Sequence, residues 1–240
     1  MAEGCRLPCR LVDLPAIGLA LELAVADRGR GSGGRRGMVV GPSTVRFVFV
    51  SDLAHFLDLP DTVPGPARKM AAQLTSIVRA ATARTGGVDW VSALACARRP
   101  GRQRCGGHLA VRRSDVPAEI WWACSDCGDD GVIRGWERSP FDLRTVERLV
   151  VADQVDVVVL EDDAVLLRSV MLADAASEAL VYGAAWSPAA AVLTGTLDAL
   201  DELADSVAAE ANHESVRRRQ RRLDAVFDGL QAAIDGHRPS

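Results

Sequence analysis

Four cysteines near the middle of the chain constrain its fold more than any other feature of the sequence. They follow the pattern C-x8-C, eighteen residues, C-x2-C, at Cys96, Cys105, Cys124 and Cys127. Structural zinc sites hold the ion in a tetrahedron of protein ligands, and two cysteine pairs about eighteen residues apart are typical of them, although the first pair, C-x8-C, is wider than usual. Glycine follows Cys105 and Cys127, as expected of tight turns that need a positive φ angle. The spacing predicts one structural Zn²⁺ bound by four thiolates.

Three strand-like segments around the cysteines predict a zinc ribbon. The segments are rich in β-branched and aromatic residues and run over His108–Arg112, Glu119–Cys124 and Gly131–Trp136. Three short strands bury too little apolar surface to fold alone, so a metal ion would supply the missing stability. Two alternatives stay open, namely four ordinary buried cysteines or disulfides in an exported chain. His108 could also replace one thiolate, because Cys96 is far from its partner in sequence.

The whole sequence predicts an α+β protein with a small αβ N-terminal region, a three-stranded zinc ribbon and a mostly helical C-terminal part. The expected parts are a flexible tail over 1–37, the αβ region over 38–93, the ribbon over 94–140 and the helical region over 141–240. The tail ends in a run of arginine and glycine that is typical of flexible segments. Met38 follows this run and is an alternative translation start, which leaves open whether residues 1–37 belong to the native protein.

Hydrophobic periodicity predicts the elements outside the ribbon. The expected strands are Val45–Val50, Val155–Leu160 and Ala189–Thr194. The expected helices run from Pro66 to about Arg84, over Thr145–Ala152, from Glu161 onward, over Ala173–Gly183 and from Thr196 onward. The apolar pattern of the last helical part slips in phase near residues 212–213. This slip predicts a helical hairpin, with a single kinked helix as the alternative.

Net charge and hydropathy argue against two classes of protein. The formal net charge is −4, so the chain as a whole is not a polycation that coats nucleic acid. The uncharged run over 179–197 is rich in alanine and is broken by glycine and proline, which argues against a membrane span. No apolar secretory segment begins the sequence. We therefore expect a cytoplasmic protein with reduced thiols and no membrane partner.

Arginines beside the cysteines make nucleic acid the first partner to consider. The candidate phosphate-binding residues are Arg98, Arg99, Arg102, Arg104, Arg112 and Arg113. Arginine binds phosphate through charge and through several N–H donors. The predicted function is therefore that of a non-enzymatic, zinc-stabilised module that binds nucleic acid or protein. The alternative is a regulatory or interaction subunit that acts through its C-terminal helices, and the sequence leaves the oligomeric state open.

The C-terminal helices change from acidic to basic along the sequence. Five arginines lie within Arg217–Arg222, and we expect them to pair internally, as Glu214 and Arg218 would at i,i+4, more than to bind phosphate. Glu210-x-x-His213 has the spacing of di-iron helix bundles, but the sequence holds no second copy. Catalytic motifs are not found elsewhere, so the sequence favours a non-enzyme and leaves a site around His213 as an alternative.

Three segments resemble a group of uncharacterised bacterial proteins that have a central zinc-ribbon-like C-x8-C…C-x2-C-G segment and a helical tail. The segments read CSDCGDDGVIRGWERSPFDL from Cys124, PGPARKMAAQLTSIVRAA from Pro64 and VAAEANHESVRRRQRRLDA from Val207. The resemblance implies that a ribbon and a helical tail are shared across the group. It implies no activity, substrate or catalytic residue.

Overall fold

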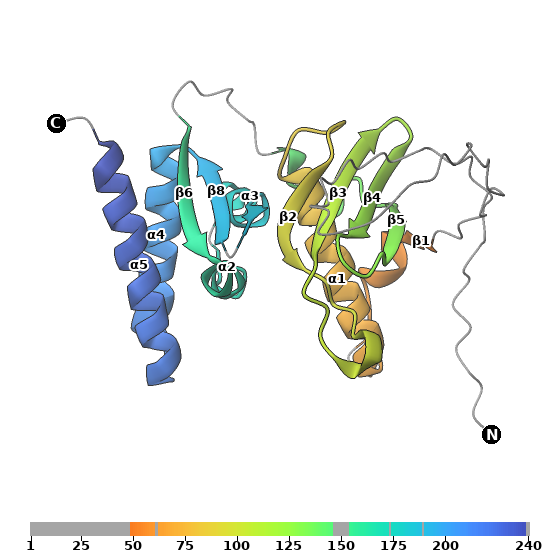
Figure 1. Cartoon of the computed structure of the whole chain (residues 1–240), viewed down its shortest axis with the longest axis horizontal. Coiled ribbons are helices and arrows are strands. Elements are labelled where there is room, and N and C mark those ends of the chain that lie inside the picture. Colours follow the sequence, from red (N-terminus) through yellow and green to blue (C-terminus); the bar gives the residue numbers. More distant parts are fainter. Residues whose placement is uncertain (1–48, 61, 146–153, 173, 189, 239–240) are drawn as a thin grey trace, which may run out of the picture.

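An eight-stranded mixed β-sheet runs through the described part of the computed structural model (Figure 1). The structure describes residues 49–60, 62–145, 154–172, 174–188 and 190–238. In sheet order the strands are β1 (Phe49–Asp52), β5 (Asp130–Arg134), β4 (Ala118–Cys124), β3 (His108–Asp115), β2 (Trp90–Ala95), β7 (Ala185–Ser187), β8 (Ala190–Gly195) and β6 (Val155–Leu160). The expected tail over 1–37, and most of the expected strand over 45–50 and helix over 145–152, lie outside the described residues.

The sheet corrects the predicted fold class. We expected a small three-stranded ribbon, but β3, β4 and β5 are neighbouring strands in a much larger sheet. β1 extends them on one side by parallel pairing with β5, and β2 extends them on the other by antiparallel pairing with β3. The prediction of a ribbon was wrong because these added strands and helix α1 (Gly65–Thr82) give the unit a hydrophobic core. The overall α+β content is as expected.

Helix α1 packs against β2, β3 and β4 and closes the first core of the molecule. Pro66 stands in its first turn, where the missing N–H of proline removes no helical hydrogen bond. Leu74, Ile77 and Val78 form the buried stripe that the periodicity predicted. Met70 was expected in the same stripe but is 48% exposed, one turn before the helix reaches the sheet.

Four helices in the described ranges enclose a second core at the other end of the sheet (Figure 1). They are α2 (Glu161–Leu167), α3 (Ala175–Tyr182), α4 (Leu197–His213) and α5 (Arg217–His237). The Thr196 side chain accepts a hydrogen bond from the N–H of Ala199 and caps the start of α4. Glu214 has an extended ψ angle of 122° between α4 and α5, and the two helices pack along each other. The predicted hairpin is therefore confirmed, and the kinked single helix is wrong.

Strand β2 connects the two cores, and the sequence did not predict it. Ala93 belongs to the second core, whereas Leu94 belongs to the first. β2 meets β7 at one residue pair, Ser92 and Ala185, with a further hydrogen bond from the Ala93 N–H to the Ala184 carbonyl. The sheet is therefore continuous but narrow at this junction. The predicted chain divisions at 37, 93 and 140 stay predictions.

None of the helices in the described ranges combines the length and the hydropathy that crossing a bilayer requires.

Candidate metal centre

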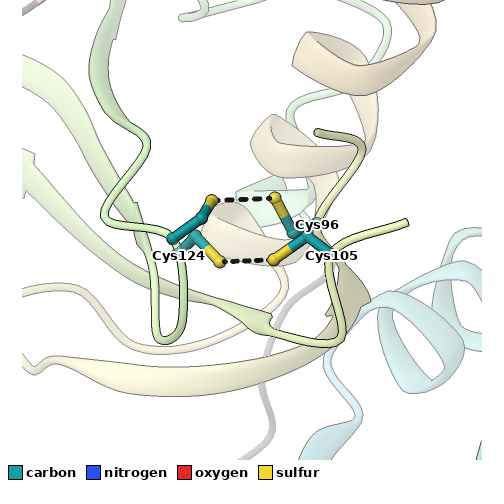
Figure 2. Close-up of side chains that lie close together, drawn as sticks. Cys96, Cys105 and Cys124 are labelled. Atoms are coloured by element: carbon teal, nitrogen blue, oxygen red, sulfur yellow. Dashed lines mark hydrogen bonds between the residues drawn. The ribbon is translucent and has the colours of Figure 1, made fainter. Parts of the chain in front are cut away.

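The four predicted cysteines meet at one end of the strands β2 to β5. Their sulfur atoms all lie within 4.8 Å of one another, and Figure 2 shows the labelled side chains of Cys96, Cys105 and Cys124 pointing toward one another. Cys96 follows β2, Cys105 precedes β3, Cys124 ends β4, and Cys127 lies in the turn that leads to β5. Residues far apart in sequence are thus brought together by the antiparallel pairing of β2 with β3 and of β3 with β4. The four thiols form a group that could hold a metal ion.

The distances between sulfur atoms fit tetrahedral coordination. Cys96 Sγ lies 3.7 Å from Cys127 Sγ, and Cys105 Sγ lies 3.7 Å from Cys124 Sγ. A regular tetrahedron with Zn–S bonds of about 2.3 Å places its sulfurs about 3.8 Å apart. A disulfide would need an S–S distance of about 2.05 Å, and all four cysteines are free thiols. The disulfide alternative therefore finds no support here.

Three of the sulfurs accept a hydrogen bond from the backbone N–H two residues further along the chain. The donors to Cys96, Cys105 and Cys124 are the N–H groups of Arg98, Gly107 and Asp126, each at 3.4 Å. The sequence predicted such donors for the close cysteine pair, and the structure shows this turn at Cys124 and also at Cys96 and Cys105. N–H donors stabilise thiolates, the form in which cysteine binds metals.

The environments of the sulfurs differ between the two sides of the cluster. Burial raises the pKa of the Cys96 and Cys124 thiols. The Asp129 N–H lowers the pKa of Cys127, which is exposed. Because three of the cysteines are buried and one is exposed, the cluster lies at the rim of the first core. A divalent cation among them would supply the positive charge that buried thiolates lack.

Two glycines permit this arrangement for different reasons. A Cβ atom on Gly107 would lie 2.6 Å from Cys124 Sγ and 2.9 Å from the Asp126 side chain, so the second position after Cys105 must lack a side chain. Gly128 has a φ angle of 68°, in the left-handed region that favours glycine, directly after Cys127. The motif Cys-Gly-Gly over 105–107 was visible in the sequence, but the close approach of Gly107 to Cys124 was not.

His108 does not belong to the sulfur cluster. Within the described residues, the group that could hold a metal contains the four cysteines and no histidine. The His108 ring stacks on Trp186 with centroids 4.7 Å apart, and its Nε2 lies 3.3 Å from Glu161 Oε1. Burial lowers the pKa of His108 despite this carboxylate. The histidine joins β3 to β7 and α2, and its role as a replacement ligand finds no support.

The arginine loop, residues 97–104, connects two of the cysteines. Its arginines are all exposed: Arg98, Arg99, Arg102 and Arg104. Arg98 Nε lies 3.4 Å from Asp129 Oδ1, and Arg98 and Arg99 line an open hollow of about 500 Å³ together with Phe49 and Cys127. The loop carries four positive charges and no acidic residue. Its ends are fixed at the sulfur cluster.

Arg113 occupies an interior position rather than the predicted phosphate-binding surface. It is 8% exposed, and its Nη1 donates to the carbonyl of Ala81 in the last turn of α1 at 3.2 Å and to that of Arg84 just beyond the helix at 2.9 Å. Its Nε donates to Asp115 at 3.1 Å. Arg113 therefore satisfies carbonyls that the end of a helix leaves without intrahelical partners. Arg112 next to it is half-buried.

We predict that Arg113→Ala destabilises the fold by about 2–3 kcal/mol, because it leaves buried carbonyls at the end of α1 without their charged donor. Arg112→Ala is the matched control, since it removes the same side chain at the neighbouring position of β3, and we expect a loss below about 1 kcal/mol. Urea unfolding followed by circular dichroism measures both values. Equal destabilisation by the two variants would contradict the interior role of Arg113.

The residues of the alternative enzymatic site have separate partners. Glu161 lies against His108, whereas Glu210 accepts from Arg219 Nη1 at 2.7 Å. Arg219 also pairs with Glu214, and this contact holds the pKa of the Glu214 carboxyl below its usual range. The predicted pairing of the arginines with the acidic residues before them is observed for Arg219, in place of Arg218, whereas Arg222 pairs with Asp163 of α2. His213 is exposed in the last turn of α4.

Comparisons with known proteins add no family to this geometry. No protein-family model matches the chain, and comparisons with curated sequences and with solved structures gave no match either. The resemblance of three segments to a bacterial group therefore stays a prediction. The sulfur cluster and the charges around it are the observations on which a function can be argued.

Proposed function

We propose that the chain is a non-enzymatic binding module in which one structural Zn²⁺, held by Cys96, Cys105, Cys124 and Cys127, fixes the arginine loop for binding to nucleic acid. The observation that carries the proposal is that four sulfurs lie within 4.8 Å of one another. Two of them, those of Cys96 and Cys105, flank a loop with four exposed arginines. Four thiolate ligands fill a tetrahedral site, which leaves no position for a catalytic water. The metal would therefore act on the structure.

The contacts of the loop support its role as a presented surface. A metal bound to Cys96 and Cys105 would close the loop at both ends and limit its conformational freedom, so that less entropy is lost on binding. A zinc tetrathiolate carries about −2 charge, and Asp129 and Asp130 line the same hollow as Arg98 and Arg99, so the positive charge is confined to the arginine loop itself. Arg98 is already paired with Asp129, so Arg99, Arg102 and Arg104 are the arginines that we expect to contact phosphates.

The test measures how strongly binding of a labelled single-stranded RNA depends on salt. We expect anisotropy titrations of the full chain at about 50 mM salt to show binding that weakens steeply as salt rises, because phosphate contacts release counterions. Replacing Arg99, Arg102 and Arg104 with serine should lower affinity at least tenfold and reduce the salt slope by about 2, at roughly 0.7 per contact on a single strand.

The matched control replaces the same number of exposed arginines elsewhere, namely Arg217, Arg218 and Arg221 in the first turns of α5. We expect this control to change affinity less than threefold. No binding at low salt would overturn the nucleic-acid part of the proposal. An equal loss in the control would show that general positive charge, rather than the arginine loop, attracts the probe.

A further inference from the structure

Helix α5 exposes a regular row of charged and small residues on the face that points away from the second core. The row, called the outer seam here, consists of Arg218, Arg221, Ala225, Asp228, Ala232 and Asp235, and all six are exposed. Their spacing alternates between three and four residues, which is the heptad spacing of helices that pair along their length. The buried stripe of α5, which contains Leu223 and Leu230, lies on the opposite face.

The arginines of α5 separate into two groups by their partners. Arg219 and Arg222, which face the rest of the molecule, pair with Glu210 and Asp163 respectively. Arg218 and Arg221 on the outer seam have no acidic partner among the described residues. α5 thus carries positive charge at the exposed start of its seam that contacts within the chain do not neutralise.

The other end of the outer seam carries the opposite charge. Asp228 and Asp235 are exposed there, and Asp235 lies 3.5 Å from Arg238, which is itself bound by Asp201 at 2.8 Å. One helix face therefore runs from positive to negative along its length. Such a face is complementary to itself when a second copy lies antiparallel to it.

We propose that a second copy of this chain docks antiparallel on the outer seam of α5 and forms a symmetric dimer. In antiparallel helix pairs, the two heptad core positions face each other across the interface. Placing Ala225 opposite Asp228 of the second copy puts Arg218 opposite Asp235 of that copy, and twofold symmetry repeats both contacts. Charge and spacing therefore select the same register.

Space along the outer seam supports this assignment. Gly229 and Gly236 lie beside the seam, and a Cβ atom at either position would meet nothing within 4 Å in the described part of the chain. Glycine inside a helix costs stability relative to alanine, and no close contact with the described residues explains it here. Two helix backbones can approach closely where side chains are this small. Figure 1 places α5 at the end of the molecule away from β1, where a second copy can reach it.

The expected dimer is weak and sensitive to salt. One pair of helices buries little area compared with standard protein interfaces, so we expect a dissociation constant between about 10 µM and 1 mM. Exposed charge pairs are screened as ionic strength rises, so the dimer should dissociate further at high salt. The dimer is independent of the proposed zinc and nucleic-acid functions, because its contacts lie on α5.

Charge-reversal variants test the proposed register. Sedimentation equilibrium of the full chain should show a mass approaching twice 25.6 kDa as protein concentration rises. Arg218→Asp and Asp235→Arg each place like charges opposite each other twice, so either variant should weaken association at least tenfold. The double variant Arg218→Asp/Asp235→Arg restores opposite pairs and should recover wild-type association. Mixing the two single variants should also produce a heterodimer.

The control variant is Asp58→Arg, which reverses an exposed charge in the half of the molecule far along the sheet from α5. It should associate as the wild type does. A monomeric mass up to about 1 mM would overturn the proposal. If neither single charge reversal changes the association of the dimer, the interface lies on another surface, and this result would also overturn the proposal. A monomer whose RNA binding depends on Arg218 would assign the seam to nucleic acid instead.

Discussion

Purified under reducing, chelator-free conditions, the wild-type chain is expected to contain one zinc per molecule, and Cys124→Ser is expected to contain almost none. Cys124 Sγ is buried, lies 3.7 Å from Cys105 Sγ and accepts the Asp126 N–H, so no other side chain can take its place without moving β4. Elemental analysis per chain measures the effect directly. It also separates zinc from iron, the other metal that suits four thiolates.

Loss of the metal should also lower the free energy of unfolding. A ligand that binds the native state at a thousandfold excess over its dissociation constant stabilises that state by about 4 kcal/mol, so we expect a loss of at least this size. Urea unfolding of the wild type with and without chelator should show the same loss as Cys124→Ser. The chelator arm distinguishes metal loss from the cost of burying a serine hydroxyl.

Cys9→Ser provides the matched control, because it removes a thiol that is not among the predicted ligands and that lies outside the described residues. We expect it to keep its zinc and its stability. If the wild type contains no metal and the chelator leaves its unfolding unchanged, the zinc proposal is wrong. The four sulfurs would then be a packed cluster of thiols within the first core.

Gly107→Ala should produce the second large effect, although it adds a single methyl group. The new Cβ would lie 2.6 Å from Cys124 Sγ, closer than real contacts allow, so either the sulfur or the loop must move. Overpacking of this kind costs about 1–3 kcal/mol, and disturbing the surroundings of ligands lowers metal affinity by about 10–100-fold. Competition with a chromophoric chelator measures the affinity, and thermal unfolding measures the stability.

Gly106→Ala is the matched control for this variant. A Cβ on Gly106 would meet the Asp126 Oδ2 atom at 3.7 Å, an ordinary contact, in the residue directly before Gly107. We expect its metal affinity to stay within about threefold of wild type, since no ligand must move. Equal effects at the two glycines would indicate that general loop rigidity, rather than the approach to Cys124, determines the result.

The sulfur cluster could be predicted from the sequence more completely than the fold around it. Cysteine spacing and the following glycines are local signals, and the four sulfurs lie together as expected. The sheet was missed because β2 reads WVSALA, whose small residues have low β-propensity, and because β7 has three residues. Without these two strands, the cysteine-bearing strands had no visible connection to β6 and β8.

The alternation of side chains along a strand already argues against part of the predicted phosphate-binding surface. Neighbouring residues of a strand point to opposite faces, so Arg112 and Arg113 on β3 could not both lie on one binding surface. Which of them faces inward depends on where α1 packs against the sheet, and the sequence pattern does not show this. The same limit applies to Arg218 and Arg219, since the arginine that pairs with Glu214 is decided by the turn between α4 and α5.

Strand β2 couples the two cores energetically. It supplies Ala93 to one core and Leu94 to the other, and Cys96, fully buried, follows directly at its end. A metal ion that fixes Cys96 would restrict the whole strand, including the Ala93 carbonyl that accepts from Arg168 beside α2. The halves of this molecule are therefore coupled through the six residues of β2, together with neighbouring contacts such as His108 on Trp186 and Arg79 with Glu178. Ion binding at one end of that strand would contribute folding free energy to helices that contact no cysteine.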